Sequence, residues 1–132
     1  METEFDRKVA ALLNKEPRYR SEAYYFVAEA VNFTVDKHQR QGHVSAAELL
    51  DGIREFAAQK FGVVAVNVLE SWGMRHEVDA GNIVYLLIGS GLLRASEDDS
   101  PEDFNTGNEL FVHQKPVKSV RAAQETPPYI DR

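Results

Sequence analysis

The 132 residues of the chain include no cysteine. Disulfide bonds, thiolate metal ligands and cysteine nucleophiles are therefore excluded. Long hydrophobic runs are also missing: the longest, residues 83–88, has six residues, whereas a membrane-spanning helix needs about 20. The first nine residues are acidic and polar, so we expect no signal peptide and a cytoplasmic location.

Basic residues are in deficit. Lys and Arg number 15 against 21 Asp and Glu, which gives a net charge of −6. A general polyanion binder needs excess Lys and Arg, so this balance argues against that class. Hydrophobic residues make up 43% and charged residues 27% of the chain, proportions that are ordinary for one globular domain.

Apolar periodicity predicts a mainly α protein. We expect a compact helical domain of about five helices over residues 1–113, with a small winged-helix-like β element toward its C-terminal end. The expected helices cover residues 3–16, 21–38, 45–61, 63–72 and 79–89. A strand is an open alternative for 63–72 and for 83–88. Residues 114–132 contain three prolines and few large apolar residues, so we expect an extended or disordered tail.

Local signals set the expected boundaries. Ser45 and Glu48 have the spacing of a capping box, in which each side chain accepts the other residue's backbone N–H. Ser21 and Asp79 are expected to cap the second and fifth helices. Short strands are expected at 92–95 and 109–113, separated by an acidic turn that contains a helix start at Ser100-Pro101.

Nine short segments carry a distinctive pattern of residues and spacing between Glu16 and Phe104, a stretch of about two-thirds of the chain. They are Pro17-Arg18-Tyr19, Glu22-Ala23-Tyr24, Phe26-Val27, Gly42-His43-Val44-Ser45, Glu48-Leu49-Leu50-Asp51-Gly52-Ile53-Arg54, Phe61-Gly62, Val68-Leu69-Glu70-Ser71-Trp72-Gly73, Gly91-Leu92-Leu93 and Asp99-Ser100-Pro101-Glu102-Asp103-Phe104. This pattern resembles the Minf_1886 family of small uncharacterised bacterial proteins. The family has no assigned activity, so the resemblance implies a bacterial protein but assigns no functional residues.

The element order from residue 45 to 113 is similar to that of a winged-helix domain, in which a third helix reads DNA and a two-stranded wing follows. The chemistry opposes that function. Residues 80–88, the would-be recognition helix, contain no Lys or Arg, and residues 97–103, the would-be wing, contain five acids. Base readout and counterion release both need basic residues. We therefore expect no sequence-specific DNA binding.

No motif assigns a catalytic, cofactor-binding or metal-binding residue, and we expect no cofactor. The four histidines have no metal-ligand spacing, although His38 and His43 flank a glycine turn. Four acids could also hold a hard cation, but they lack the alternating order of a calcium loop. The simpler interpretation is that they form the solvated, acidic start of a helix. They are Asp98, Asp99, Glu102 and Asp103.

Glu29 is the most distinctive acid. It lies in a helix that is apolar nearly all round, and if it is buried it needs a partner, with Tyr19 or Arg54 as candidates; the sequence leaves its burial open. A structural pair is the simpler interpretation. The alternative is an enzyme that uses Glu29 or His76, the latter beside Glu77.

The sequence favours a small non-catalytic binding or regulatory module that acts through protein partners. An apolar surface is expected from Leu92, Leu93, Phe104, Leu110, Phe111 and Val112. The first alternative is a winged-helix-like nucleic-acid-associated regulator, for which Arg18, Arg20, Lys37, Arg40 and Arg75 would have to share one face. The second alternative is the enzyme just described. The sequence specifies neither the partner nor the oligomeric state.

Overall fold

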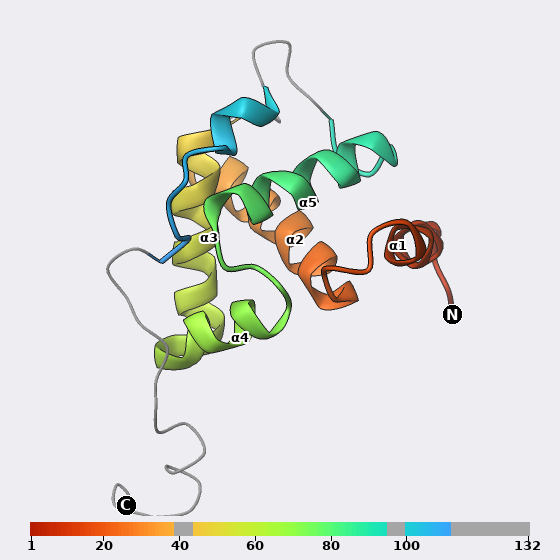
Figure 1. The fold of residues 1–132 in the computed structure, drawn as a ribbon, viewed down its shortest axis with the longest axis horizontal. Helices are drawn as coiled ribbons and strands as arrows, with labels where there is room; N and C mark the ends of the chain where they lie inside the picture. The colour runs from red at the N-terminus through yellow and green to blue at the C-terminus, as the bar shows by residue number, and fades with distance from the viewer. Residues whose placement is uncertain (39–43, 95–99, 112–132) are drawn as a thin grey trace, which may run out of the picture.

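The computed structural model describes residues 1–38, 44–94 and 100–111, and these residues form helices joined by short turns (Figure 1). The elements are α1 (Glu4–Lys15), α2 (Ser21–Lys37), α3 (Ala46–Phe61), the 3-10 turn η1 (Gly62–Val64), α4 (Ala65–Ser71), α5 (Glu77–Gly89) and the 3-10 turn η2 (Pro101–Phe104). The mainly helical class is confirmed. None of the described helices has both the length and the apolar character needed to span a bilayer.

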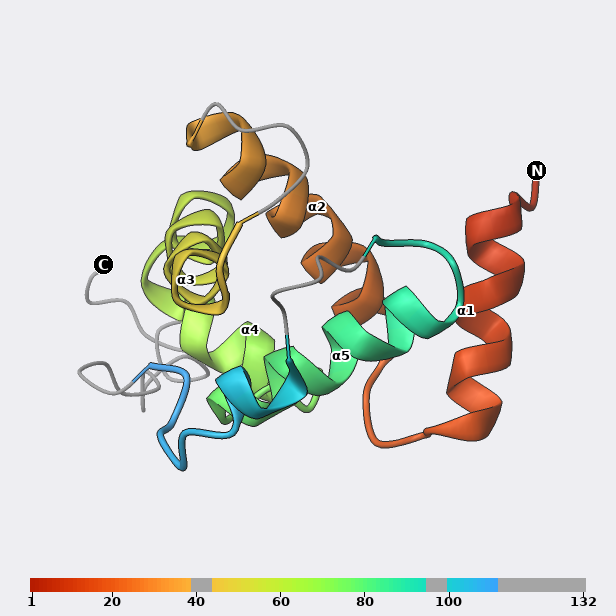
Figure 2. The ribbon, with the colours of Figure 1, turned by 90° about the horizontal axis from the view of Figure 1, so that it is seen from above.

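Helix α2 is the centre of the packing. It contacts α1, α3 and α5, and Figure 2 shows α1 on one side of the molecule and α3 on the other, with α2 and α5 between them. The buried side of α2 consists of Ala23, Tyr24, Phe26, Val27, Ala30 and Thr34. Its exposed face consists of Glu22, Tyr25, Glu29, Asn32 and Asp36, which follow each other at intervals of three or four residues. The helix is therefore amphipathic rather than buried all round.

The predicted capping box at the start of α3 is confirmed. The Glu48 backbone N–H donates to Ser45 Oγ at 3.1 Å, and the Ser45 N–H donates to Glu48 Oε1 at 2.9 Å. The cap predicted at Ser21 is wrong: Ser21 is the first helical residue, and Arg20 precedes it without a side-chain cap. Ser21 Oγ contacts the neighbouring Glu22 carboxylate at 3.3 Å instead.

Helices α2 and α3 cross very closely at Gly52. A Cβ atom on Gly52 would lie 1.8 Å from Thr34 Oγ1. Thr34 is fully buried, and its hydroxyl donates to the Ala30 carbonyl at 2.7 Å, which satisfies it within α2. The crossing therefore depends on the missing side chain of one helix and on a back-bonded threonine of the other.

Helices α4 and α5 both end in a Schellman motif. After α5, the Gly91 N–H donates to the Ile88 carbonyl and the Leu92 N–H to the Leu87 carbonyl. After α4, Gly73 and Met74 make the equivalent bonds to the carbonyls of Glu70 and Leu69. Gly73 and Gly91 have φ angles of +97° and +80°, the left-handed conformation that this motif requires.

Residues 83–88, which the sequence left open between helix and strand, are helical. Helix α5 begins at Glu77, two residues before the predicted cap. Asp79 is its third residue, and its carboxylate accepts the N–H of His76, the residue that precedes the helix, at 2.8 Å. Residues 63–72 are likewise helical, divided between η1 and α4.

The winged-helix-like β element is not supported. No strand occurs in the described ranges, and their only β-type pairing is an isolated bridge between His76 and Glu109. Leu92 and Leu93 follow the Schellman glycine, where an apolar residue packs back on its own helix rather than extending into a strand. Leu110 and Phe111 lie in a turn. Ala95, His113 and the tail predicted over 114–132 fall outside the described residues.

Replacing the α3 cap should lower stability by a predictable amount. We expect Ser45→Ala to reduce the free energy of unfolding by about 1 kcal/mol, because the first turn loses its hydroxyl acceptor. Ser21→Ala is the matched control and should change the free energy by less than about 0.5 kcal/mol, since Ser21 caps nothing. Urea denaturation of both variants measures the difference. Equal midpoints would mean that the capping box contributes nothing.

The close α2–α3 crossing leads us to expect that Gly52→Ala changes stability in the direction opposite to the one that helix propensity predicts. Alanine is favoured over glycine in a helix by about 1 kcal/mol, but overpacking a core costs about 1–3 kcal/mol. At 1.8 Å from Thr34 the second effect should win, so Gly52→Ala should lower the free energy of unfolding. Gly89→Ala is the control: its Cβ meets nothing within 4 Å, so it should be neutral or stabilising. A higher free energy of unfolding in Gly52→Ala would contradict the close contact between Gly52 and Thr34.

Candidate functional site

Glu29, whose burial the sequence left open, is exposed. Its side chain is 57% exposed and pairs with Lys60 at 3.3 Å. Glu29 belongs to the exposed face of α2, together with Glu22, Tyr25 and Asn32, so it does not need a buried partner. Neither of its predicted partners, Tyr19 and Arg54, contacts it. A catalytic role for Glu29 therefore loses the burial on which it depended.

The buried acids are Glu77 and Asp79, at the start of α5. Arg54 donates to one Glu77 carboxylate oxygen and Thr106 Oγ1 to the other. Arg54 Nε also donates to the Leu110 carbonyl at 2.5 Å, which holds the chain after η2 against α3. Arg54, which the sequence offered as a candidate partner for Glu29, therefore pairs with Glu77 instead.

Asp79 joins three segments of the chain. The Tyr19 hydroxyl donates to Asp79 Oδ1 at 2.8 Å, and the backbone N–H groups of Arg75 and His76 donate to Oδ2. Asn82 Nδ2 in turn donates to the Tyr19 oxygen at 2.9 Å. Burial raises the pKa of Tyr19 above its usual range, so this hydroxyl remains a donor. Both Asp79 oxygens accept hydrogen bonds, as expected for a buried carboxylate.

The other candidate residues do not assemble into a site within the described residues. The His76 ring is half exposed, and Nδ1 lies 3.7 Å from Asp79 Oδ2, while the neighbouring Glu77 is engaged by Arg54 and Thr106. His38 lies 3.8 Å from Glu48, and no metal-type cluster of His, Asp and Glu occurs in the described ranges. Three residues of the cation hypotheses, His43, Asp98 and Asp99, lie outside those ranges.

The basic residues considered for nucleic acid are each opposed by an acid wherever the structure describes them. Arg18 pairs with Glu16, Arg20 with Glu22, Lys37 with Glu55, and Arg75 with Glu70. Arg40 lies outside the described residues. These pairs leave no unopposed basic face among the four.

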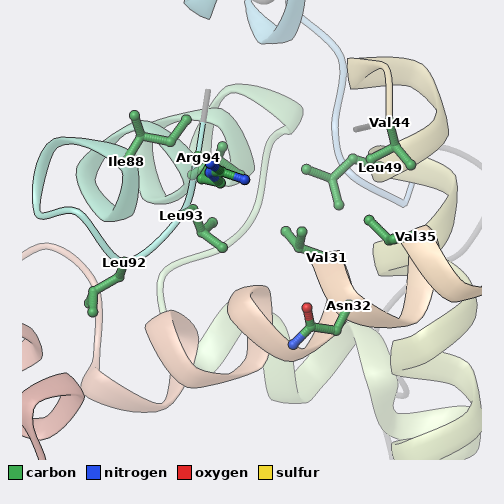
Figure 3. A pocket seen from close by; sticks show the side chains of 10 residues that line it. Val31, Asn32, Val35, Val44, Leu49, Ile88, Leu92, Leu93 and Arg94 are labelled. Carbon is green, nitrogen blue, oxygen red and sulfur yellow. The ribbon is translucent and has the colours of Figure 1, made fainter. Parts of the chain in front are cut away.

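The strongest candidate site is an apolar pocket of about 260 Å³ between α2, α3 and α5 (Figure 3). Eight apolar side chains line it: Val31, Val35, Val44, Leu49, Val84, Ile88, Leu92 and Leu93. Two polar residues, Asn32 and Arg94, complete the lining, and both are exposed. We refer to this set as the apolar pocket.

Local sequence rules explain the α2 and α5 walls of the apolar pocket. Val31 and Val35 are one turn apart on α2, and Val84 and Ile88 are one turn apart on α5, so each pair presents a short apolar ridge. The left-handed Gly91 then reverses the chain, and Leu92 and Leu93 follow directly. In Figure 3 the Leu93 side chain points toward Val31 across the pocket.

The predicted apolar surface is only partly correct. Phe104, Leu110 and Phe111 are buried in the core, and Val112 lies outside the described residues. Leu92 and Leu93 are half-buried and line the pocket. Sequence reasoning missed the α2 and α3 walls. The available signal was the glycine-terminated end of α5, since the residues after such a glycine pack against the helix they follow.

Comparison of the chain with protein-family models, curated proteins and solved structures found no match. No relative therefore assigns a role to a residue of the pocket. What the pocket binds has to be inferred from its size, its apolar walls and its two polar groups.

Two buried tyrosines should respond in opposite ways to the loss of their hydroxyls. We expect Tyr19→Phe to lower the free energy of unfolding by about 1–3 kcal/mol, because Asp79 loses a donor in a buried setting. Tyr24 is fully buried, and its hydroxyl has no hydrogen-bond partner among the described residues. Tyr24→Phe should therefore be neutral or stabilising. Thermal and urea denaturation of the pair test this, and a strongly destabilising Tyr24→Phe would reveal a hidden partner.

Proposed function

We propose that the protein is a small non-catalytic binding module that recognises a partner protein through the apolar pocket. The observation that carries the proposal is an apolar pocket in which five side chains are only half-buried, namely Val31, Val35, Ile88, Leu92 and Leu93, with only Arg94 and Asn32 as polar groups. Leaving such a surface in water is unfavourable, and an apolar side chain of a partner would remove it from water.

The size of the pocket favours side chains over a cofactor. Its volume of about 260 Å³ is below the range of about 300–1,000 Å³ that is typical of sites for drug-sized ligands. One or two large apolar side chains of a peptide or helix suit such a space, as in helix-in-groove recognition. Buried anchors of this kind supply most of the affinity of many interfaces.

Arg94 and Asn32 indicate which residues of the partner lie beside its apolar anchor side chain. The Arg94 guanidinium can form a bidentate pair with a carboxylate, and the Asn32 amide can bond a backbone group. We therefore propose a partner segment with large apolar residues next to Asp or Glu. A cytoplasmic location and membership of the Minf_1886 family remain further parts of this proposal.

The two alternatives have less support. A winged-helix regulator would need a wing, and no strand occurs in the described ranges. Its reading helix, α5, also has no Lys or Arg from Glu77 to Gly89. The enzyme alternative rested on Glu29 or on His76 beside Glu77, but Glu29 is exposed and paired with Lys60, and Glu77 is bonded to Arg54.

The test is a selection of displayed random peptides on the full chain, followed by titration of the enriched peptides. We expect enrichment of large apolar residues beside Asp or Glu. Leu93→Asp should weaken binding at least about tenfold, because it places a charge in the apolar wall. Val63→Asp is the matched control: Val63 is 82% exposed and lies outside the pocket, so binding should be unchanged. Equal effects of the two substitutions would overturn the proposal.

A further inference from the structure

A second, chemically different groove lies between α2 and the C-terminal ends of α3 and α4. Its volume is about 230 Å³, and it shares no residue with the apolar pocket. Four aromatic residues line it, together with two acids and one lysine. The residues are Tyr25, Phe26, Phe61, Trp72, Glu22, Glu29 and Lys60, and we refer to them as the aromatic groove.

Its aromatic wall is held in place by packing. Trp72 lies edge-on to Phe61, with ring centroids 5.6 Å apart and planes at 82°, and Phe26 lies 5.7 Å from Trp72. Phe26 is only 3% exposed, whereas Phe61 and Trp72 are half-buried. The Schellman motif at Gly73 fixes the backbone beside Trp72, and the Trp72 carbonyl accepts the Arg20 N–H at 3.1 Å. The exposed aromatic surface is therefore preorganised.

Carboxylates flank this aromatic surface. Glu22 and Glu29 are seven residues apart on α2, which places them two turns apart on one face, with Tyr25 between them. Their side chains are 50% and 57% exposed. Their present partners are also exposed: Arg20 lies 3.6 Å from Glu22, and Lys60 lies 3.3 Å from Glu29. Exposed pairs of this kind are weak, so another cation can replace them.

We propose that the aromatic groove binds an arginine side chain presented by a polypeptide partner. Aromatic faces attract cations through their quadrupole, and the carboxylates add Coulomb attraction. A guanidinium suits both surroundings because it is planar, stacks on aromatic rings and donates to carboxylates in a fork. The proposal stands on the groove alone, so failure of the apolar-pocket proposal would leave it intact.

The ligand test uses a capped Gly-Arg-Gly tripeptide and the full chain. Citrulline in place of arginine gives a neutral control of nearly the same shape. Trp72 is the single tryptophan of the chain, so a change in its emission reports on the groove. We expect saturable binding of the arginine peptide that weakens with salt, and binding at least about tenfold weaker for the citrulline peptide. Equal binding of the two peptides, or of a lysine peptide, would overturn the assignment.

Three variants separate this site from a general charge effect. Glu29→Gln should weaken arginine-peptide binding about threefold, the factor expected for one exposed charge pair. Lys60→Met should tighten it by a similar factor, because it releases Glu29 and removes a competing cation. Glu55→Gln is the matched control: Glu55 is an exposed acid paired with Lys37, outside the groove, and should leave binding unchanged. Weaker binding in Lys60→Met, or an equal loss in Glu55→Gln, would refute the site.

Discussion

The hydrogen bonds of two buried carboxylates at the start of α5 determine where the rest of this helix lies. Asp79 connects α5 to the turn between α1 and α2 through Tyr19, and Glu77 connects it to α3 through Arg54. A buried carboxylate without donors costs several kcal/mol, so each acid admits only the arrangement that satisfies it. This fixes the position of α5, and with it the apolar ridge and the Leu92–Leu93 wall of the apolar pocket.

Both binding candidates lie beside helix ends that stop at a left-handed glycine. Gly91 precedes the leucines of the apolar pocket, and Gly73 follows the tryptophan of the aromatic groove. The motif satisfies the last carbonyls of each helix with backbone N–H groups and so allows a sharp reversal. Large side chains beside such a reversal are held near the surface by a rigid backbone rather than by a long loop.

The helices could be predicted from the sequence because their signals are local. The Ser45 capping box and the glycine stops act within a few residues, and they specify the ends of α3, α4 and α5. The strand predicted at 92–95 is wrong because two leucines after a glycine are compatible both with an extended strand and with a chain that packs back on the preceding helix. Only the hydrogen bond from Leu92 to Leu87 distinguishes the two cases.

The candidate site was less predictable because it depends on contacts between distant residues. Tyr19 and Arg54 were identified as candidate partners for a buried acid, but the acid considered was Glu29, and the buried acids are Asp79 and Glu77. In sequence, Glu77 and Asp79 look like ordinary acids in the first turn of a helix, where they complement the helix dipole. Which acid is buried follows from the crossing of α2, α3 and α5, and no local pattern encodes that crossing.

The large sequence separation between the residues that these hydrogen bonds join couples ligand binding to folding. Tyr19 and Asp79 are 60 residues apart, and Arg54 and Leu110 are 56 apart, so closing them costs more chain entropy than pairing adjacent helices. Leu92 and Leu93 follow directly on α5, the helix whose start the Tyr19–Asp79 bond holds. A ligand of the apolar pocket therefore selects the completely folded chain and, by mass action, shifts the folding equilibrium of the whole domain toward it.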